Sequence, residues 1–468
     1  MTGRVAADRL VACVDFGSTF TKALLVDLDT CDVVATASSP TTIATDVLEG
    51  WTACRAELAA AVPAARDAQV LACSSAGGGL RVAVVGNEEL VTAEAGRRVA
   101  LSSGGTVVHV GAGGLAGDGA LDALRETRPD LVLLVGGTDG GNADVLLGAA
   151  ERLARARWPE PVVVAGNADV TPQSVQLLVE AGVDAMPAAN VVPQIGVLAP
   201  EPARAAIRET FLSHVIGGKR LSASSAFLDM VRGPTPDVVL TGVELLASGL
   251  DQDHPGVGDV AVVDIGGATT DVHTVVEVDP EDGALARQVV ASTPVTRSVE
   301  GDLGMRWSAV TTVERGIETG LVAEHERPAL ERAAAAYAQE PAGLPDDATG
   351  RALDLRLAEL ALGVALRRHA GRQRVAFGPG GRLVERDGID LREVALLVGS
   401  GGVLRHSPPR LAEDAVRSGT GDPVSGGWLL PRSPRVAVDR TYVLVAAGLL
   451  AAEHPHQAYT LLRRYLAE

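Results

Sequence analysis

The sequence contains few cysteines, and none of them lies in a pattern typical of a metal site. The four cysteines, Cys13, Cys31, Cys54 and Cys73, are widely spaced and form no CxxC motif. This pattern argues against a zinc site and a disulfide framework, and it indicates a reduced, cytoplasmic protein. The N-terminal stretch lacks the apolar core of a signal peptide, and the longest apolar run, near residues 442–452, is too short to span a bilayer.

Positive charge is also scarce, and almost all of it comes from arginine. The chain has 41 Lys and Arg residues against 59 Asp and Glu residues, which gives a formal net charge of -18. A surface this acidic argues against general binding to nucleic acids or membranes, because both are anionic. The only lysines are Lys22 and Lys219. The lysine at position 22 therefore invites a chemical explanation, although chance also produces such a placement.

The sequence does contain enough apolar residues for a large core. It has 468 residues, of which 47% are hydrophobic and 21% charged, and this length suits two or three domains. A buried strand, a glycine-rich turn and a helix follow one another twice, at residues 131–157 and 162–181. That alternation predicts parallel βαβ units.

Two polar tips, far apart in the chain, share one pattern. Each begins with an aspartate at the end of an apolar strand and continues through glycine and hydroxyl residues into a second strand. A single tip of this kind is more simply an ordinary β-hairpin turn. Two tips with the same Asp-x-Gly opening indicate an internal repeat and two related domains that face each other. The polar residues are Asp15, Gly17, Ser18, Thr19, Thr21 and Lys22 in the first tip, and Asp264, Gly266, Gly267, Thr269, Thr270 and Asp271 in the second.

This composition suits the binding of phosphate groups. Glycine lets backbone N–H groups approach a phosphate, and Ser and Thr hydroxyls add donors without bulk. A carboxylate beside a phosphate needs a cation between the two, so Asp15 and Asp264 are candidates to hold a hydrated Mg²⁺. Lys22 would supply a point charge to a phosphate oxygen. A third strand runs into a turn that could lie against a nucleoside, and the glycines of this turn are Gly399, Gly401 and Gly402.

These three motifs resemble those of the actin-like ATPase superfamily, which includes sugar kinases, Hsp70-type chaperones and actin. The resemblance implies an α/β fold with two RNase H-like domains around an ATP cleft, and an additional βαβ region in the first half. It places the two tips on the phosphates, with Mg²⁺ held by Asp15 and Asp264. It also implies that Asp264 or Asp271 positions the attacking water and that Lys22 assists catalysis. The motifs that carry the resemblance are VDFGSTFTK, VVDIGGATTDV and LLVGSGG.

Longer phrases are similar to the glutamate mutase L family, also called MutL and unrelated to the mismatch-repair protein of that name. The similarity covers nearly the whole chain. It implies an ATP-driven chaperone that reactivates an adenosylcobalamin-dependent mutase by ejecting damaged cofactor, through slow opening and closing of the cleft. ATP and Mg²⁺ are the implied cofactors, and a mutase subunit is the implied partner. The phrases are ASSPTTIATDV, ACSSAGGGLRVAVVG, VLLVGGTDGGNADVL, VVVAGN and VEGDLGMR.

The same resemblance suggests where the domains begin and end. Residues 8–255 would form the first actin-like domain, including a βαβ region near residues 130–200. Residues 256–435 would form the second domain. Residues 436–468 would form helices that return to the first domain.

Alternatives to this interpretation stay open. Glu300 and Asp302 flank a glycine and could present a catalytic base, as in a small-molecule kinase of the same superfamily, or could form an exposed acidic turn. A nucleotide-regulated scaffold with little hydrolysis is a third hypothesis. The loop at residues 136–142 does not match GxGxxG, so we expect a partner contact or a structural turn there rather than a Rossmann cofactor site. Asp271 and His273 lack the glycine of the DxHxxG cobalamin signature, so we expect no cobalamin site in this chain.

Overall fold

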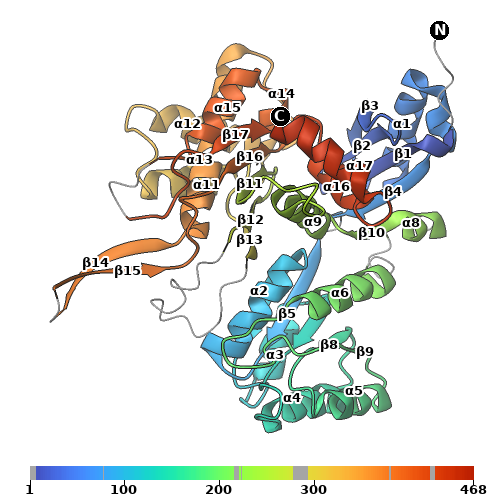
Figure 1. Ribbon diagram of the computed structural model, residues 1–468, viewed down its shortest axis with the longest axis vertical. Helices are drawn as coiled ribbons and strands as arrows, with labels where there is room; N and C mark the ends of the chain where they lie inside the picture. The colour runs from blue at the N-terminus through green and yellow to red at the C-terminus, as the bar shows by residue number, and fades with distance from the viewer. Residues whose placement is uncertain are drawn as a thin grey trace. The chain divides into compact units, whose positions relative to one another are not determined.

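The computed structural model describes residues 7–76, 78–215, 221–222, 224–277, 294–378, 381–421 and 427–468. The chain divides into two compact units (Figure 1). The N-terminal unit comprises Met1–Leu240 with Gln288–Thr293, and the C-terminal unit comprises Thr241–Arg287 with Pro294–Glu468. Within the described ranges, every helix is too short or too polar to cross a membrane.

Five strands form the first sheet of the N-terminal unit, in the order β10-β4-β1-β2-β3. β1 and β2 are antiparallel, as are β2 and β3, whereas β4 runs parallel to β1 and β10 parallel to β4. β1 is central and wholly buried, which explains why its sequence is an almost unbroken apolar run. The elements are β1 Leu10–Phe16, β2 Phe20–Asp27, β3 Asp32–Pro40, β4 Gln69–Ser74, β10 Val231–Pro234, α1 Val47–Ala61, α8 Ser225–Met230, α9 Thr235–Ser248 and the short helical turns Ala7–Arg9 and Pro63–Asp67.

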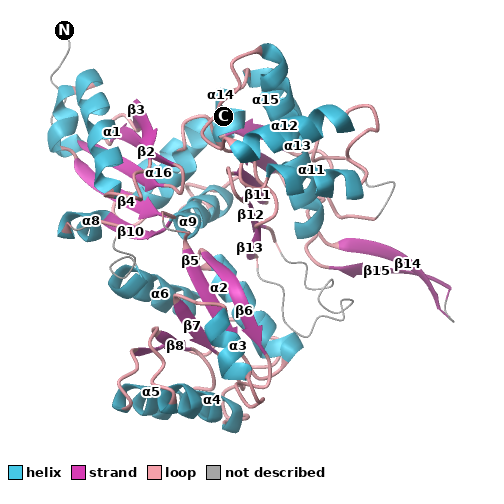
Figure 2. Ribbon diagram, turned by 180° about the vertical axis from the view of Figure 1, so that it is seen from behind, coloured by secondary structure: helices cyan, strands magenta, loops and turns pink. Residues whose placement is uncertain are grey.

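A second, fully parallel sheet is inserted between β4 and β10, in the order β6-β5-β7-β8-β9. Helices α2 and α6 pack on one face of this inserted sheet, and α3, α4 and α5 pack on the other (Figures 1 and 2). The chain therefore adds strands on both sides of the first strand of this sheet, β5. The elements are β5 Leu80–Val85, β6 Gly105–Gly111, β7 Leu131–Leu134, β8 Val162–Val164, β9 Ala185–Pro187, α2 Glu94–Ser102, α3 Ala120–Glu126, α4 Asp144–Arg155, α5 Thr171–Glu180, α6 Glu201–Thr210 and the helical turns Glu89–Ala93 and Phe211–Val215.

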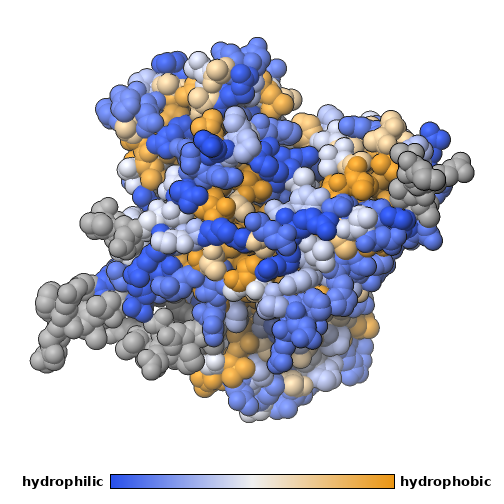
Figure 3. All heavy atoms as spheres, turned by 45° about the horizontal axis from the view of Figure 1, so that its top comes forward, coloured by the Kyte–Doolittle hydropathy of each residue, from blue (hydrophilic) through white to orange (hydrophobic). Residues whose placement is uncertain are grey.

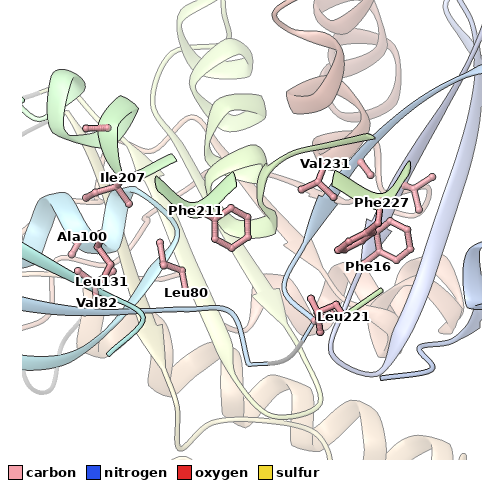
Figure 4. Close-up of a cluster of buried hydrophobic side chains, with 14 of the residues drawn as sticks. Phe16, Leu80, Val82, Ala100, Leu131, Ile207, Phe211, Leu221, Phe227 and Val231 are labelled. Carbon is pink, nitrogen blue, oxygen red and sulfur yellow. The ribbon is translucent and has the colours of Figure 1, made fainter. Parts of the chain in front are cut away.

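One hydrophobic core connects the two sheets of the N-terminal unit. It extends from Phe16 at the end of β1 to Leu80 at the start of β5. The rings of Phe16 and Phe227 meet edge to face, with their centroids 5.1 Å apart. Figure 4 shows Phe211 between the side chains around Leu80 and those around Phe227. The inserted sheet is thus anchored by apolar packing to the strand that carries the first tip.

The main sheet of the C-terminal unit repeats the first sheet in strand order and direction. Its order is β13-β12-β11-β16-β17, with β11, β12 and β13 antiparallel in sequence and β16 and β17 parallel to β11. If the strands of each sheet are numbered in chain order, both sheets have the same spatial order, 3-2-1-4-5. The elements are β11 Val260–Ile265, β12 Thr270–Val275, β13 Val295–Glu300, β16 Leu396–Ser400, β17 Arg435–Val438, the hairpin β14 Arg372–Gly378 and β15 Gly381–Asp387, α11 Ala309–Glu318, α12 Arg327–Gln339, α13 Ala348–His369, α14 Gly402–His406, α15 Pro409–Arg417, α16 Val443–Leu450, α17 Pro455–Leu462 and the helical turn Arg463–Ala467.

This duplication confirms the predicted internal repeat and the predicted α/β fold with two related halves and an additional parallel βαβ region. The inserted sheet begins with β5, whereas the sequence pattern of strand, glycine-rich turn and helix is plain only from β7 onward. The domain boundaries, the cleft between the halves and the return of residues 436–468 to the first domain stay predictions.

Capping side chains determine where α1 and α13 begin. Asp46 accepts a hydrogen bond from the N–H of Leu48 at 2.8 Å where α1 begins, and Asp347 does the same for Gly350 at 2.6 Å where α13 begins. α13 ends with Arg367 and Arg368 in its last turn, where positive charge is favourable because the helix dipole is negative at this end. The long central helix of the C-terminal unit is therefore fixed at both ends by its own sequence.

We predict that Leu133→Ala weakens the inserted sheet strongly. Leu133 is fully buried in β7, between β5 and β8, so the truncation leaves a cavity and should lower the free energy of opening by about 3 kcal/mol. Hydrogen exchange of the β7 amides, read by mass spectrometry, measures this change. Val179→Ala on the exposed surface of α5 is the matched control and should change protection in β7 by less than about 0.5 kcal/mol. Equal effects of the two variants would contradict the packing described above.

Candidate nucleotide-binding site

The first tip is closed by a glycine that cannot be replaced. The N–H of Gly17 donates to the carbonyl of Phe20 at 3.2 Å, and a Cβ atom at Gly17 would lie 2.7 Å from that oxygen. The turn therefore needs glycine for space. Ser18 is exposed and Thr19 partly exposed at the outside of this turn. Their hydroxyl groups are the donors that a phosphate at the tip would meet first.

The strand register divides the remaining residues of the first tip between two faces. Asp15 and Lys22 are directly opposite each other on β1 and β2, so they share one face of the sheet. Thr21 lies on the other face, fully buried, with its hydroxyl 3.2 Å from that of Thr41. A Cβ atom at Gly50 of α1 would lie 3.1 Å from the Thr21 hydroxyl. Thr21 therefore packs under α1, and its predicted phosphate contact stays a prediction.

Asp15 is buried and is held by three side chains. The Lys22 Nζ atom lies 3.5 Å from Asp15 Oδ2, and the Thr235 hydroxyl donates to Asp15 Oδ1 at 2.7 Å. The Cys73 thiol is also 3.7 Å from Oδ1. Burial, and next the charge of Asp15, raises the pKa of Cys73 well above its usual value, so the thiol stays protonated. The carboxylate is thus oriented by donors on β2, β4 and α9.

The second tip repeats the geometry of the first. The N–H of Gly266 donates to the carbonyl of Thr269 at 2.9 Å, and a Cβ atom at Gly266 would lie 2.9 Å from that oxygen. Gly267 and Thr269 are partly exposed, whereas Thr270 is fully buried and donates to the Leu303 carbonyl at 3.0 Å. Thr270 thus occupies the position that Thr21 has in the first tip.

The two tips differ at the position opposite the leading aspartate. Asp264 pairs in register with Asp271, where the first tip has Lys22 opposite Asp15. Asp271 Oδ2 accepts a hydrogen bond from the buried Arg297 guanidinium at 3.2 Å. Within the described part of the chain, the buried Asp271 Oδ1 atom has no hydrogen-bond partner. Arg297 therefore fixes one oxygen of Asp271, whereas the buried second oxygen keeps an unused capacity to accept a hydrogen bond.

The segment at residues 301–308 is hydrogen-bonded to the backbone of the second tip. The N–H groups of Met305, Arg306 and Trp307 donate to the carbonyls of Gly266 and Gly267 at 2.8 to 3.0 Å. Sequence analysis noted part of this segment for its family resemblance without predicting that it braces the phosphate tip. The contact follows from tertiary structure, because the segment follows β13 at the edge of the sheet and the tip follows β11 near its centre.

Asp302, the candidate base of a kinase, is bound by arginines. Arg368 donates to both of its oxygens at 2.6 and 3.0 Å, and Arg315 donates at 3.2 Å. Arg368, followed by lesser causes that include Arg315, holds the pKa of Asp302 below its usual value. Asp302 is thus a weaker proton acceptor than an unpaired aspartate, and it would have to leave Arg368 to reach a substrate.

The third motif lies directly beside the second tip. β16 pairs with β11 so that Ser400 is opposite Asp264. A Cβ atom at Gly401, which has a φ of 119°, would lie 2.3 Å from the Ile265 carbonyl, so this glycine permits the close approach. Gly399 is buried, and a Cβ atom there would lie 2.3 Å from Val416 of α15, so its backbone packs against that helix. Gly402 begins α14 with open space around it.

Sequence analysis did not predict two residues that act on the leading aspartates of the tips. Thr235 donates to Asp15, and Asp439 lies close enough to Asp264 to feel its charge. Asp439 follows β17, is buried, and accepts hydrogen bonds from the N–H groups of Val443 and Leu444 at the start of α16. Burial raises the pKa of Asp439 to about 6, and the charge of Asp264 contributes to that rise. A signal for Asp439 was present in the sequence, because it is another aspartate that ends an apolar strand before a helix. No local signal marks Thr235.

The residues of the two tips have the chemistry that a hydrated magnesium ion prefers. Asp15 and Asp264 are carboxylates, which are hard oxygen donors, at the ends of two equivalent strands. The Lys22 Nζ atom lies 3.5 Å from Asp15 Oδ2, which is longer than a close hydrogen bond, so this oxygen can also accept a hydrogen bond from a water ligand of the ion. Asp15 belongs to the N-terminal unit and Asp264 to the C-terminal unit, and their sharing of one ion stays a prediction.

A buried histidine at the end of α13 contacts β12 and β13, the strands that follow the second tip. The two ring nitrogens of His369 lie 2.9 Å from the hydroxyls of Thr274 and Ser298. Burial lowers the pKa of His369 to about 4 and that of nearby His273 well below its usual value. Both histidines are therefore neutral at physiological pH, and His273 is a core residue of β12.

Sequence comparison finds a family and a curated relative that match nearly the full length of the chain. A family model described as "MutL protein" matches residues 11–466. Protein MutL of Clostridium tetanomorphum is 34% identical over 461 residues, which cover 97% of this chain and 98% of that protein.

Solved structures that are similar to this chain are more distant. One is the nucleotide-free structure of acetone carboxylase, studied for ATP-dependent acetone carboxylation. It is 16% identical with a TM-score of 0.42, and the match covers 95% of this chain and 70% of the acetone carboxylase chain. Xylulose kinase from Bifidobacterium adolescentis is 12% identical with a TM-score of 0.31, over 98% of this chain and 93% of its own. Plasmodium falciparum glycerol kinase with ADP is 11% identical with a TM-score of 0.29, and the match covers 97% of this chain and 92% of the kinase chain. These likenesses concern the fold alone.

We predict that His369 makes the protein sensitive to acid. The unfolded chain protonates this histidine near pH 6.5, whereas the folded chain does so only near 4. The stability that neutral His369 contributes is fully present above about pH 6.5 and is lost as the pH falls towards about 4. His369→Gln removes the titration, so wild type should lose up to about 3 kcal/mol more unfolding free energy than the variant between about pH 7 and about pH 4. Urea unfolding at both pH values measures the difference, and identical acid sensitivity of the two proteins would contradict it.

Proposed function

Because this chain belongs to the MutL protein family, we propose that it is an ATP-binding and ATP-hydrolysing reactivating factor for an adenosylcobalamin-dependent mutase. The observation that carries the nucleotide part of this proposal is the duplicated Asp-x-Gly turn, closed by the same hydrogen bond at Gly17 and at Gly266. The mutase part rests on the family resemblance of the sequence.

In this proposal the two tips divide the work of binding the triphosphate. Backbone N–H groups and hydroxyls of both tips bind phosphate oxygens, and Lys22 adds a positive charge from the first tip. Asp15 and Asp264 hold the hydrated Mg²⁺, which neutralises phosphate charge when it is bound. The turn at Gly401 and Gly402 lies against the nucleoside.

Asp271 is the residue that we propose to orient the attacking water. Arg297 fixes one of its oxygens, so the other keeps a defined direction and can accept a hydrogen bond from the water. Asp264 is then left for the magnesium ion. This assignment gives the two aspartates of the second tip separate tasks.

The mechanism that we propose for reactivation is a hinge. ATP connects the two halves through their tips and favours a closed state, and loss of the γ-phosphate releases that state. A mutase subunit that binds the two states with different affinity would be driven by the cycle to release damaged cobalamin. A switch of this kind needs only slow turnover. No cobalamin-binding residues of this chain enter the proposal.

We predict that Thr235→Val weakens the apparent affinity for Mg²⁺ in ATP hydrolysis. The variant removes the hydroxyl that donates to Asp15 Oδ1 at 2.7 Å, a hydrogen bond to a charged group worth about 1.5 kcal/mol or more. The Mg²⁺ concentration for half-maximal ATP hydrolysis should therefore rise by roughly tenfold. Thr235→Ser keeps the hydroxyl and is the matched control. If the valine and serine variants titrate alike, Thr235 does not orient Asp15 for this purpose.

We predict that Asp264→Ala abolishes phosphate release from ATP, with a loss of roughly a hundredfold or more, because the metal ligand is removed. Wild-type turnover should rise when a purified mutase carrying inactivated cofactor is added, and the variant should not respond. The measurement is steady-state phosphate release with and without the mutase. Full activity of Asp264→Ala would refute the site. A phosphorylated metabolite would indicate a kinase, and ATP binding without turnover would indicate a scaffold.

A further inference from the structure

The carboxyl edge of the inserted sheet is built from five loops. In a doubly wound parallel sheet, ligands are bound at this edge, where the chain leaves the strands towards opposite faces. The chain leaves β5 towards α2 on one face and leaves the neighbouring strand β7 towards α4 on the other face. The strands β5, β7 and β8 lie side by side in Figure 2. We call this surface the carboxyl edge, formed by residues 86–93, 112–119, 135–143, 165–170 and 188–200.

The carboxyl edge is acidic without any basic side chain of its own. No lysine, arginine or histidine occurs in its five loops, although the chain has 41 Lys and Arg residues. Arginines of the neighbouring helices are engaged elsewhere or lie at the margin of this surface. Arg97 is paired with Glu94 and Arg204 with Asp237, and Arg152 of α4 donates to the Ala116 carbonyl at 3.0 Å. An anionic ligand such as a nucleotide or a nucleic acid is therefore disfavoured here. Five carboxylates of these loops are exposed, and they are Glu88, Glu89, Asp118, Asp139 and Asp169.

Large apolar side chains are exposed among these carboxylates. Leu90, which follows β5, is 70% exposed, and Ile195 and Val197, which follow β9, are 81% and 45% exposed. Figure 3 shows one face of the molecule, where hydrophobic residues are scattered among hydrophilic ones, so a single exposed apolar residue is ordinary. Here they flank a sheet edge at both ends. β5 and β9 are three strand spacings apart, which is about 14 Å and suits a protein surface better than one small molecule.

The loop between these apolar residues is held rigidly. The buried Asn190 amide donates to the Gly137 carbonyl at 3.0 Å and to Asp139 Oδ1 at 2.8 Å, and the Ala168 N–H donates to the same oxygen at 2.9 Å. The buried Asn167 amide donates to the Gly141 carbonyl at 3.2 Å. Asp139 is thus exposed and yet fixed. A partner that binds a fixed carboxylate loses less conformational entropy.

We propose that the carboxyl edge is the docking surface for the mutase, and that it recognises apolar side chains surrounded by lysine and arginine on that partner. Charge complementarity selects such a partner, since the edge offers only negative charge around Leu90 and Ile195. The identity of the partner rests on the proposed function, whereas the location and chemistry of the surface do not. The loop at residues 136–142, which sequence analysis left between a partner contact and a structural turn, becomes the centre of this surface.

The experiment measures binding of the full-length chain to a purified adenosylcobalamin-dependent mutase of the same organism. Leu90→Glu and Ile195→Glu each place a charge in the apolar part of the edge and should weaken binding by roughly tenfold or more. Val179→Glu is the matched control, because Val179 is 55% exposed on α5 of the same sheet but outside the five loops. It should bind within about twofold of wild type. ATP hydrolysis without the mutase should be unchanged in all three variants.

A second pair of variants tests the charge. Asp139→Asn keeps the oxygen that Asn190 and Ala168 hold, and Glu88→Gln keeps the side-chain length. Combined, they should weaken binding at low salt and flatten its salt dependence. Binding by Leu90→Glu and Ile195→Glu as tight as by Val179→Glu would overturn the docking surface and leave the proposed function intact. Wild-type chain that binds no mutase would overturn both. Loss of a homo-oligomer in Ile195→Glu, read by light scattering, would assign the edge to a second copy of this chain and overturn the proposal.

Discussion

The candidate site depends on one steric constraint, which is a glycine that follows an aspartate at the end of a central strand. At both Gly17 and Gly266 the N–H closes the turn on a carbonyl that leaves no space for a Cβ atom. The tight reversal places the aspartate at the same point of two equivalent sheets. The paired strands, the buried threonine beneath each tip and the neighbouring loops are all arranged around this reversal.

Duplication of the turn did not preserve its charges. The residue opposite the leading aspartate is Lys22 in one half and Asp271 in the other. A lysine offsets the charge of Asp15, whereas Asp271 needs the buried Arg297 to offset its own. Two tips with the same backbone therefore differ in charge, because a lysine is opposite the leading aspartate in the first and an aspartate is opposite it in the second.

Much of the fold and part of the site could be predicted from local sequence. Buried strands such as β1 and β11 are apolar runs, and the Asp-x-Gly openings are contiguous, so the repeat was visible. Thr235 was not, because its contact with Asp15 joins residues 220 positions apart. Thr21 is similar, since only the strand register shows that it faces α1 and the core. Residue types can be read from the sequence. The face of the sheet on which a residue of a tip lies cannot, because polar and apolar residues do not alternate regularly there.

The sequence by itself determined the two tips, the acidic composition and membership of the MutL family, because each is a property of contiguous residues or of whole-chain similarity. Only the tertiary structure decided which distant groups meet. Parallel strands bring all their carboxyl ends to one edge, so loops spread between residues 86 and 200 become neighbours and form one surface whose own residues include no lysine, arginine or histidine. Burial likewise changed the chemistry of Asp439 and His369, since their pKa values depend on the water that folding removes.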